Sequence, residues 1–131
     1  MNKEILEGNK LIVAFMELKP TEWRGMYSVS QDHCTCQEST PEKALDRFAS
    51  IAKYHKSWDW LMPVLKKIEA KGHRWEIGMS PTSSQHHYCK IWSIGTIERV
   101  SLLDAVYSAV VGFIKWYNSN KQTNDNARIN H

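Results

Sequence analysis

The chain has 131 residues, of which 42% are hydrophobic and 24% charged, and this fits one domain whose core needs neither disulfides nor metal. The net charge of +3 gives no support for a dedicated nucleic-acid surface, although it admits a small anionic ligand. No apolar stretch approaches the roughly 18 residues that span a bilayer, so we expect a soluble, intracellular protein with no membrane contact. Six tryptophans and five tyrosines are the compositional anomaly.

The first part of the chain predicts two helices separated by a short strand. Apolar residues at helical spacing favour a helix over 3–18, and weak alternation favours a strand over 24–31. Residues 32–40 are typical of a loop. Thr40 before Pro41 is a typical N-cap followed by proline at the first helical position, so a helix should cover 41–53.

Two tryptophans flank Asp59 where the next helix is predicted to begin, in YHKSWDWLMPVLKKIEAKG over 54–72. With Ser57 as the N-cap, Pro63 would lie inside the second turn and displace a backbone carbonyl. With Asp59 as the N-cap, only the first intrahelical hydrogen bond is lost. The second start costs less free energy, and Gly72 should end the helix as a left-handed cap.

Two alternating segments, 73–80 and 86–94, predict strands that pair antiparallel, because the five residues between them cannot carry a parallel crossover. Alternation places His86, Tyr88 and Lys90 on one face of the second strand.

The last predicted helix, over 101–118, has two apolar stripes and begins at a capping box led by Ser101. A helix that is apolar on two sides is either buried on both sides or packs against another chain through its small residues. We expect a homo-oligomer, formed through Leu102, Ala105, Ala109, Gly112 and Trp116. Residues 119–131 are polar and aperiodic, which predicts a flexible C-terminal tail after a single domain over 1–118. The fold class expected from these elements is α+β, with one small antiparallel sheet of three to four strands packed with helices in an α/β/α sandwich-like arrangement.

Two segments carry a family resemblance: SWDWLMPVLKKIE at 57–69 and LLDAVYSAVVGFIKWYN at 102–118. Together they resemble a group of small bacteriophage and prophage proteins that have a WDWLMPVxxKIE helix and a closing AVYxAVVxFIKWYN helix. The resemblance implies a helix, sheet, helix sandwich and a role in the infected host. Several small phage proteins sequester a nucleotide signal of bacterial immunity without chemistry, so the resemblance also implies a place in the host cytoplasm.

The first candidate binding residues are Trp58, Asp59 and Trp60. Indole rings stack on bases, and a helix N-terminus offers N–H groups to phosphate. The alternative is that one tryptophan fills the core and the other covers a sheet edge.

The second candidate group lies on the predicted strands, where aromatic and cationic side chains can bind phosphate or stack on a base. The alternative is a solvated sheet edge. Its members are Arg74, Trp75, His86, Tyr88, Lys90 and Trp92.

Metal binding and catalysis have weaker signals. His33, Cys34, Cys36, His87 and Cys89 would make zinc ligands only if the loop met the strand, and unpaired cytosolic thiols are the preferred interpretation. No phosphate loop, nucleophile elbow or zinc-protease motif is present. We therefore expect no cofactor and no enzymatic activity.

These patterns together predict a phage-encoded protein that sequesters a small nucleotide-type immune signal, such as a cyclic nucleotide or an ADP-ribose derivative. The alternative is an interaction module that inhibits a host or phage protein through an aromatic patch.

Overall fold

The computed structural model describes residues 2–31 and 34–129, with the backbone alone for 121–129. This part of the chain forms four helices and two three-stranded antiparallel sheets, which confirms the α+β class. The strands form two sheets where the sequence predicted one. The chain divides into two compact units, residues 1–64 and 65–131. Whether they behave as the single domain expected over 1–118 stays a prediction.

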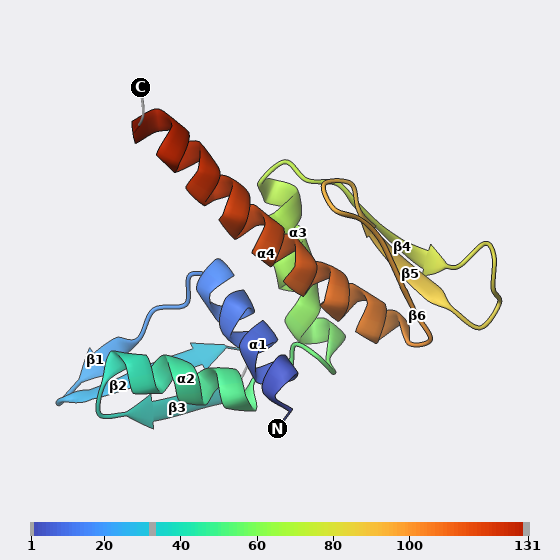
Figure 1. Cartoon of the computed structure of the whole chain (residues 1–131). Coiled ribbons are helices and arrows are strands. Elements are labelled where there is room, and N and C mark those ends of the chain that lie inside the picture. The colour runs from blue at the N-terminus through green and yellow to red at the C-terminus, as the bar shows by residue number, and fades with distance from the viewer. Residues whose placement is uncertain (1, 32–33, 130–131) are drawn as a thin grey trace. The chain divides into compact units, whose positions relative to one another are not determined.

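The first unit contains the N-terminal helices and the first sheet (Figure 1). Its elements are α1 (Lys3–Phe15), β1 (Thr21–Trp23), β2 (Met26–Gln31), β3 (Cys34–Glu38), α2 (Pro41–Ile51) and the beginning of α3 (Trp58–Ala70). The sheet order is β1-β2-β3. Arg24 and Gly25 form the tight turn between β1 and β2, both with positive φ, as a two-residue hairpin requires.

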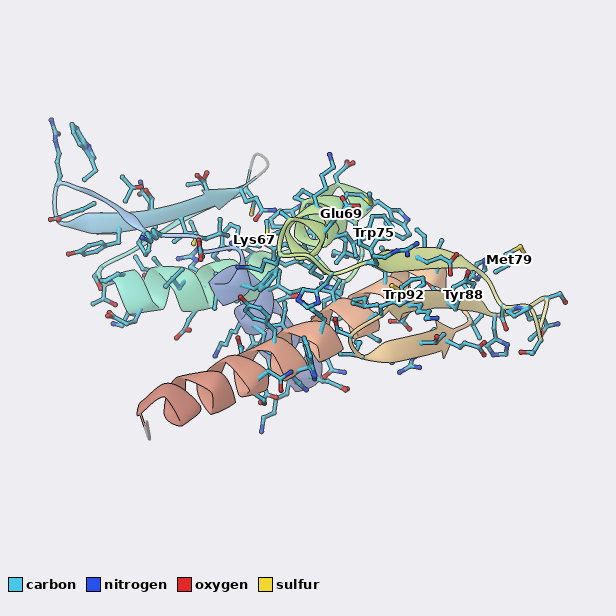
Figure 2. The ribbon with its side chains drawn as sticks, turned by 90° about the horizontal axis from the view of Figure 1, so that it is seen from above. Lys67, Glu69, Trp75, Met79, Tyr88 and Trp92 are labelled. Atoms are coloured by element: carbon cyan, nitrogen blue, oxygen red, sulfur yellow. The ribbon has the colours of Figure 1, made fainter. Side chains whose placement is uncertain are left out.

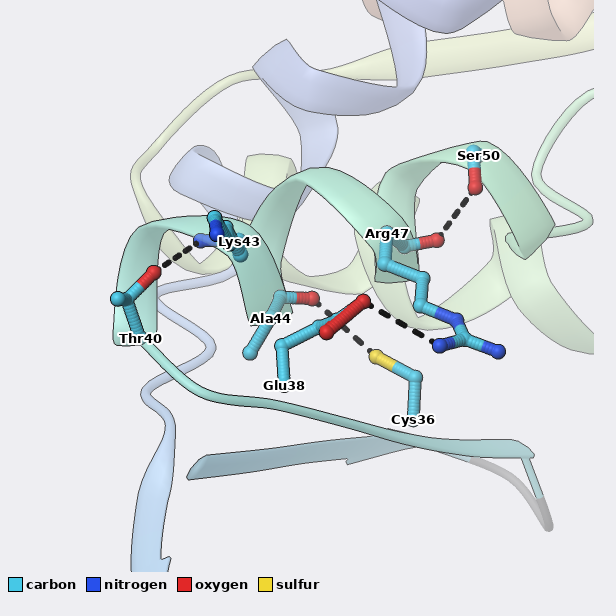
Figure 3. Close-up of polar contacts among 7 residues, drawn as sticks. All are labelled: Cys36, Glu38, Thr40, Lys43, Ala44, Arg47 and Ser50. Atoms are coloured by element: carbon cyan, nitrogen blue, oxygen red, sulfur yellow. Dashed lines mark hydrogen bonds and ion pairs between the residues drawn. The ribbon is translucent and has the colours of Figure 1, made fainter. Parts of the chain in front are cut away.

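β3 occupies residues where the sequence predicted a loop, and α2 holds it in place. The N-cap of α2 is as predicted: the Thr40 hydroxyl accepts a hydrogen bond from the Lys43 N–H at 3.2 Å, with Pro41 following. The Cys36 thiol donates to the Ala44 carbonyl at 3.2 Å (Figure 3). Buried Cys36 and the ion pair of Glu38 with Arg47 at 3.2 Å thus join β3, which pairs with β2 along its whole length, to α2.

The core of the first unit lies between α1, α2 and the sheet. The Asn9 amide, fully buried, donates to the carbonyls of Ala49 and Ala52 at 3.0 and 3.2 Å and so ties α1 to the end of α2. The buried side chains of this unit include Ile12, Val13, Phe15, Val29, Phe48, Tyr54 and Trp60.

α3 begins two residues earlier than the sequence favoured. The first intrahelical hydrogen bond runs from the Leu61 N–H to the Ser57 carbonyl at 3.1 Å, so Ser57, not Asp59, precedes the helix. Pro63 therefore lies inside α3. The free energy gained by burying the apolar residues on both sides of Pro63 outweighs the hydrogen bond that proline cannot donate. Gly72 ends the helix with φ of 92°, as predicted.

The second unit contains the rest of α3, then β4 (Trp75–Met79), β5 (His87–Ile91), β6 (Gly95–Arg99) and α4 (Leu102–Ile129). The predicted antiparallel hairpin is confirmed, and β6 adds a strand that the sequence did not predict. α4 packs against β5 and β6, and the inward residues Cys89 and Ile91 are fully buried beneath it. One face of each sheet is thus covered by a helix of its own unit.

Part of the α4 stripe that was assigned to a homo-oligomer is occupied within the chain, while Leu102, Gly112 and Trp116 stay partly exposed. Ala105 and Ala109 are fully buried. Ile94 lies 3.6 Å from the position of a Cβ on Gly112, and Trp116 packs edge-on against His73 with ring centroids 5.6 Å apart. Gly112 thus lies close to Ile94 of its own unit. The homo-oligomer stays a prediction.

The helical backbone of α4 continues to Ile129, beyond residue 118 where the apolar pattern ends. The expected flexibility of 119–131 stays a prediction, and residues 130 and 131 lie outside the described part of the chain. Among the described residues, none of the helices combines the length and apolar content that crossing a bilayer takes.

Candidate functional site

The outward face of the second sheet gathers most of the strand residues predicted as a site. In the register, Glu76 lies opposite Lys90 and Gly78 opposite Tyr88. The Trp92 N–H donates to the Arg74 carbonyl at 3.1 Å, which continues the pairing beyond β4. Tyr88 lies within β5 and Trp92 directly after it (Figure 2). Because alternate residues share a face, these side chains lie opposite the face that α4 covers. We call this surface the outer face of β4–β6; its members are Arg74, Glu76, Gly78, Tyr88, Lys90, Trp92, Thr96 and Glu98.

Two cations converge on one exposed tryptophan of this face. The Arg74 guanidinium lies 4.9 Å and the Lys90 ammonium 4.3 Å from the Trp92 ring centroid. The Trp92 residue is 45% exposed. Within the described part of the chain, neither cation has a carboxylate within ion-pairing distance. Both positive charges lie within 5 Å of the same ring centroid, so an anion beside Trp92 would be attracted by both.

Tyr88 occupies the centre of the face because its neighbour is a glycine. A Cβ on Gly78 would lie 3.2 Å from Cε1 of Tyr88, so the phenol ring lies over the glycine. Partial burial, together with hydrogen bonding to the Glu76 carboxylate and its negative charge, raises the pKa of the Tyr88 phenol. The phenol therefore keeps its proton at physiological pH and remains a donor.

Glu98, on β6, lies opposite Tyr88 in the register. Its Oε1 accepts a hydrogen bond from the buried Ser80 hydroxyl at 2.9 Å. A carboxylate has about four lone-pair sites, so Glu98 is oriented by Ser80 and retains acceptor capacity toward solvent. The outer face is thus cationic at its Trp92 end and carries carboxylates around Tyr88.

His86 borders this face without being part of β5. Its Nδ1 lies 2.8 Å from the Ser83 hydroxyl, and its carbonyl accepts from the Ser80 N–H at 2.9 Å. These bonds hold His86 in the connection between β4 and β5.

Trp75 lies on the other face of the sheet. It is opposite the buried Ile91, and its Nε1 is buried without a hydrogen-bond partner among the described residues. Trp75 therefore does not belong to the outer face.

The residues around the start of α3 belong to the first unit and have separate roles. Trp60 is 3% exposed, with its ring edge-on to Tyr54 at 5.1 Å and tilted against Phe48 at 5.8 Å. A ring enclosed in this way cannot stack on a ligand, so its assignment to the site is corrected: Trp60 fills the core. Trp58 is half-buried, and Asp59 is exposed in the first turn, where its charge favours the helix dipole.

The cysteines are packing residues in this structure. Cys36 and Cys89 are buried, and burial raises the pKa of the Cys89 thiol to about 12. Among the described residues, no three His, Cys, Asp or Glu side chains come together as metal ligands, and His33 lies outside those residues.

Sequence reasoning missed Gly78 and Glu98. The glycine that interrupts an alternating strand was the available signal, since such a glycine often marks close approach of another group. Glu98 had no signal because β6 itself was not predicted.

Comparison of the chain with protein-family models, curated proteins and solved structures gives no significant match. The resemblance to phage proteins therefore stays a prediction.

Proposed function

We propose that this chain is a non-enzymatic binding protein that holds a small nucleotide-type anion on the outer face of β4–β6. The convergence of Arg74 and Lys90 on Trp92, with neither cation in an ion pair among the described residues, carries the proposal. Folding does not require two cations at one exposed ring, whereas Arg and Lys side chains held close together suit phosphate binding.

The aromatic rings of the same face can bind the base of a nucleotide by stacking. A base stacked on an aromatic side chain is worth about 1–3 kcal/mol, and Tyr88 and Trp92 share the face with both cations. In the phage setting implied by the sequence resemblance, the ligand would be an immune signal in the host cytoplasm. Sequestration then counters host defence without turnover.

Isothermal titration against cyclic dinucleotides and ADP-ribose derivatives tests the proposal. We expect heat with at least one member, and about tenfold or greater loss of affinity in Trp92→Ala. The matched control is Trp23→Ala, which removes another exposed tryptophan that has a cation over its ring. Absence of heat with every member, or equal loss in both variants, would overturn the proposal.

Recovery of the ligand separates binding from catalysis. After incubation and heat denaturation, chromatography should return the bound nucleotide unchanged. A degradation product that accumulates with time would instead identify an enzyme. Affinity should also fall as salt is raised from 50 to about 500 mM, because exposed cations are screened.

The first sheet favours a second candidate function, an interaction module for a host or phage protein. Trp23 is 68% and Met26 40% exposed, and they lie opposite each other in the hairpin. Exposed apolar side chains of this kind are typical of protein contacts. Pull-down from host lysate with wild type and Trp23→Ala tests it: a captured protein must be lost in the variant.

A further inference from the structure

The orientation and chemical class of the ligand can be read from the outer face of β4–β6, and this step rests on the proposed function. The intuitive arrangement places a base on Trp92, the larger ring. That ring, however, already has the Arg74 guanidinium at 4.9 Å and the Lys90 ammonium at 4.3 Å. Trp92 therefore serves to hold the two cations, and the space beside it suits a phosphate.

Tyr88 is the available platform for a base. Its ring lies over Gly78, where the missing side chain makes room for it, and no cation lies over this ring among the described residues. Tyr88 lies within β5 and Trp92 directly after it, so Lys90 stands between them on the same face, opposite Thr96. A sugar over Lys90 and Thr96 would therefore join a phosphate at Trp92 to a base over Tyr88.

The two carboxylates that flank Tyr88 set the chemistry of the base. Glu98 is oriented by the Ser80 hydroxyl at 2.9 Å, and Glu76 lies beside the Tyr88 phenol. Ionised carboxylates only accept hydrogen bonds. They therefore favour a base edge that donates through an exocyclic amino group and disfavour one that presents a carbonyl.

We propose that the ligand is an amino-bearing nucleotide, with its phosphate between Arg74 and Lys90, its base over Tyr88, and its exocyclic amine on Glu76 or Glu98. Trp92 is then a positioning residue for the cations and Tyr88 the base-stacking residue. This reverses the roles that ring size alone would suggest.

Adenosine 5′-monophosphate, inosine 5′-monophosphate and inorganic pyrophosphate are the three probes, because the first two share the phosphate and sugar and differ at the amine. For the wild type we expect adenosine monophosphate to bind about fivefold or more tightly than inosine monophosphate. The preference for adenosine monophosphate over inosine monophosphate should be lost in at least one of the variants Glu76→Gln and Glu98→Gln, because a glutamine amide can also donate a hydrogen bond. Glu22→Gln, an exposed glutamate of β1, is the control and should keep the ratio.

Tyr88→Ala should weaken adenosine monophosphate about tenfold and leave pyrophosphate binding unchanged. Tyr88→Phe keeps the ring, so it should recover most of the affinity that Tyr88→Ala loses. It also provides a test of the ring's role if the alanine variant misfolds. Equal affinity for the two nucleotides in the wild type, or a ratio that survives both glutamine variants, would overturn this inference alone. If none of the three probes binds and the wider panel gives no heat, the proposed function itself is overturned.

Discussion

The two sheets have outer faces that share one motif and differ in charge. Each presents an exposed tryptophan with a cation over its ring: Arg24 lies 5.3 Å from the Trp23 centroid, and Arg74 and Lys90 flank Trp92. Apart from Trp23 and Met26, the described outward residues of the first sheet are uncharged polar side chains, namely Thr21, Ser28, Ser30, Thr35 and Gln37. The second outer face contains two cations and two carboxylates.

This difference shows which feature needs a functional explanation. Significant cation–π pairs occur roughly once per 70–80 residues, so the pair at Trp23 is what an ordinary surface provides. At Trp92 a second cation lies close to the same ring, and among the described residues neither cation forms an ion pair, although Glu76 lies opposite Lys90 in the register. This difference supports the proposed anion site on the second sheet and gives no such support for the first.

The largest expected effect separates the tryptophans that stabilise the fold from those that do not. Trp60→Ala should lower the free energy of unfolding by about 3–5 kcal/mol, because it empties the buried space between Tyr54 and Phe48. Trp23→Ala and Trp92→Ala should each change it by less than about 1 kcal/mol. Urea denaturation followed by circular dichroism measures all three, and a comparable loss in Trp92→Ala would make Trp92 a structural residue.

The next effect concerns anion affinity. The double variant Arg74→Ala, Lys90→Ala should weaken pyrophosphate binding about thirtyfold or more, since two charge-assisted contacts are lost. Arg24→Ala, the matched change on the first sheet, should leave the affinity unchanged. Titration calorimetry at low salt provides the comparison, and a similar loss in both variants would mean that net charge alone attracts the anion.

A second positive charge can also be introduced on the outer face of the first sheet. Met26→Lys places an ammonium opposite Trp23 and beside Arg24, which imitates the pair of cations at Trp92. A weak second pyrophosphate site is expected in this variant, roughly tenfold or more weaker than the site at Trp92, because no other group has been arranged for it. If no second site appears, two cations at a ring are insufficient and the carboxylate side of the outer face must contribute.

The smallest effect tests the environment of Tyr88. Glu76→Gln removes a negative charge that opposes phenolate formation, so the pKa of Tyr88 should fall toward the ordinary tyrosine value of 10. At alkaline pH the variant should therefore ionise Tyr88 before the wild type does. NMR titration of labelled tyrosine ring carbons measures this, and an unchanged Tyr88 titration would show that burial alone is responsible.

Much of the helical framework could be predicted from the sequence because its signals are local. The cap at Thr40, the end of α3 at Gly72 and the start of α4 after Ser101 each depend on neighbouring residues. The start of α3 was missed because the cost of Pro63 was judged locally, whereas burial of the surrounding apolar residues decides it.

The site was predictable only in part for the same reason. Alternation placed Tyr88 and Lys90 on one face, which the register confirms. Alternation alone separates Trp75 from Arg74, so placing both in one candidate group was not a consequence of the pattern. What alternation cannot tell is which of the two faces a helix covers. The small residues of α4, such as Ala105 and Gly112, fit either packing within the chain or contact with a second chain, and the sequence pattern alone cannot separate these two uses.

The most direct test of the binding account is to map a bound nucleotide onto the backbone. Adenosine 5′-monophosphate would be titrated into the ¹⁵N-labelled full chain while amide chemical shifts are recorded. We expect saturable shifts concentrated in residues 74–78, 88–92 and 96–98, with none in 21–30. Shifts concentrated on the first sheet, or no saturable shifts with this nucleotide or any ligand of the wider panel, would contradict the assignment of the outer face of β4–β6 as the binding site.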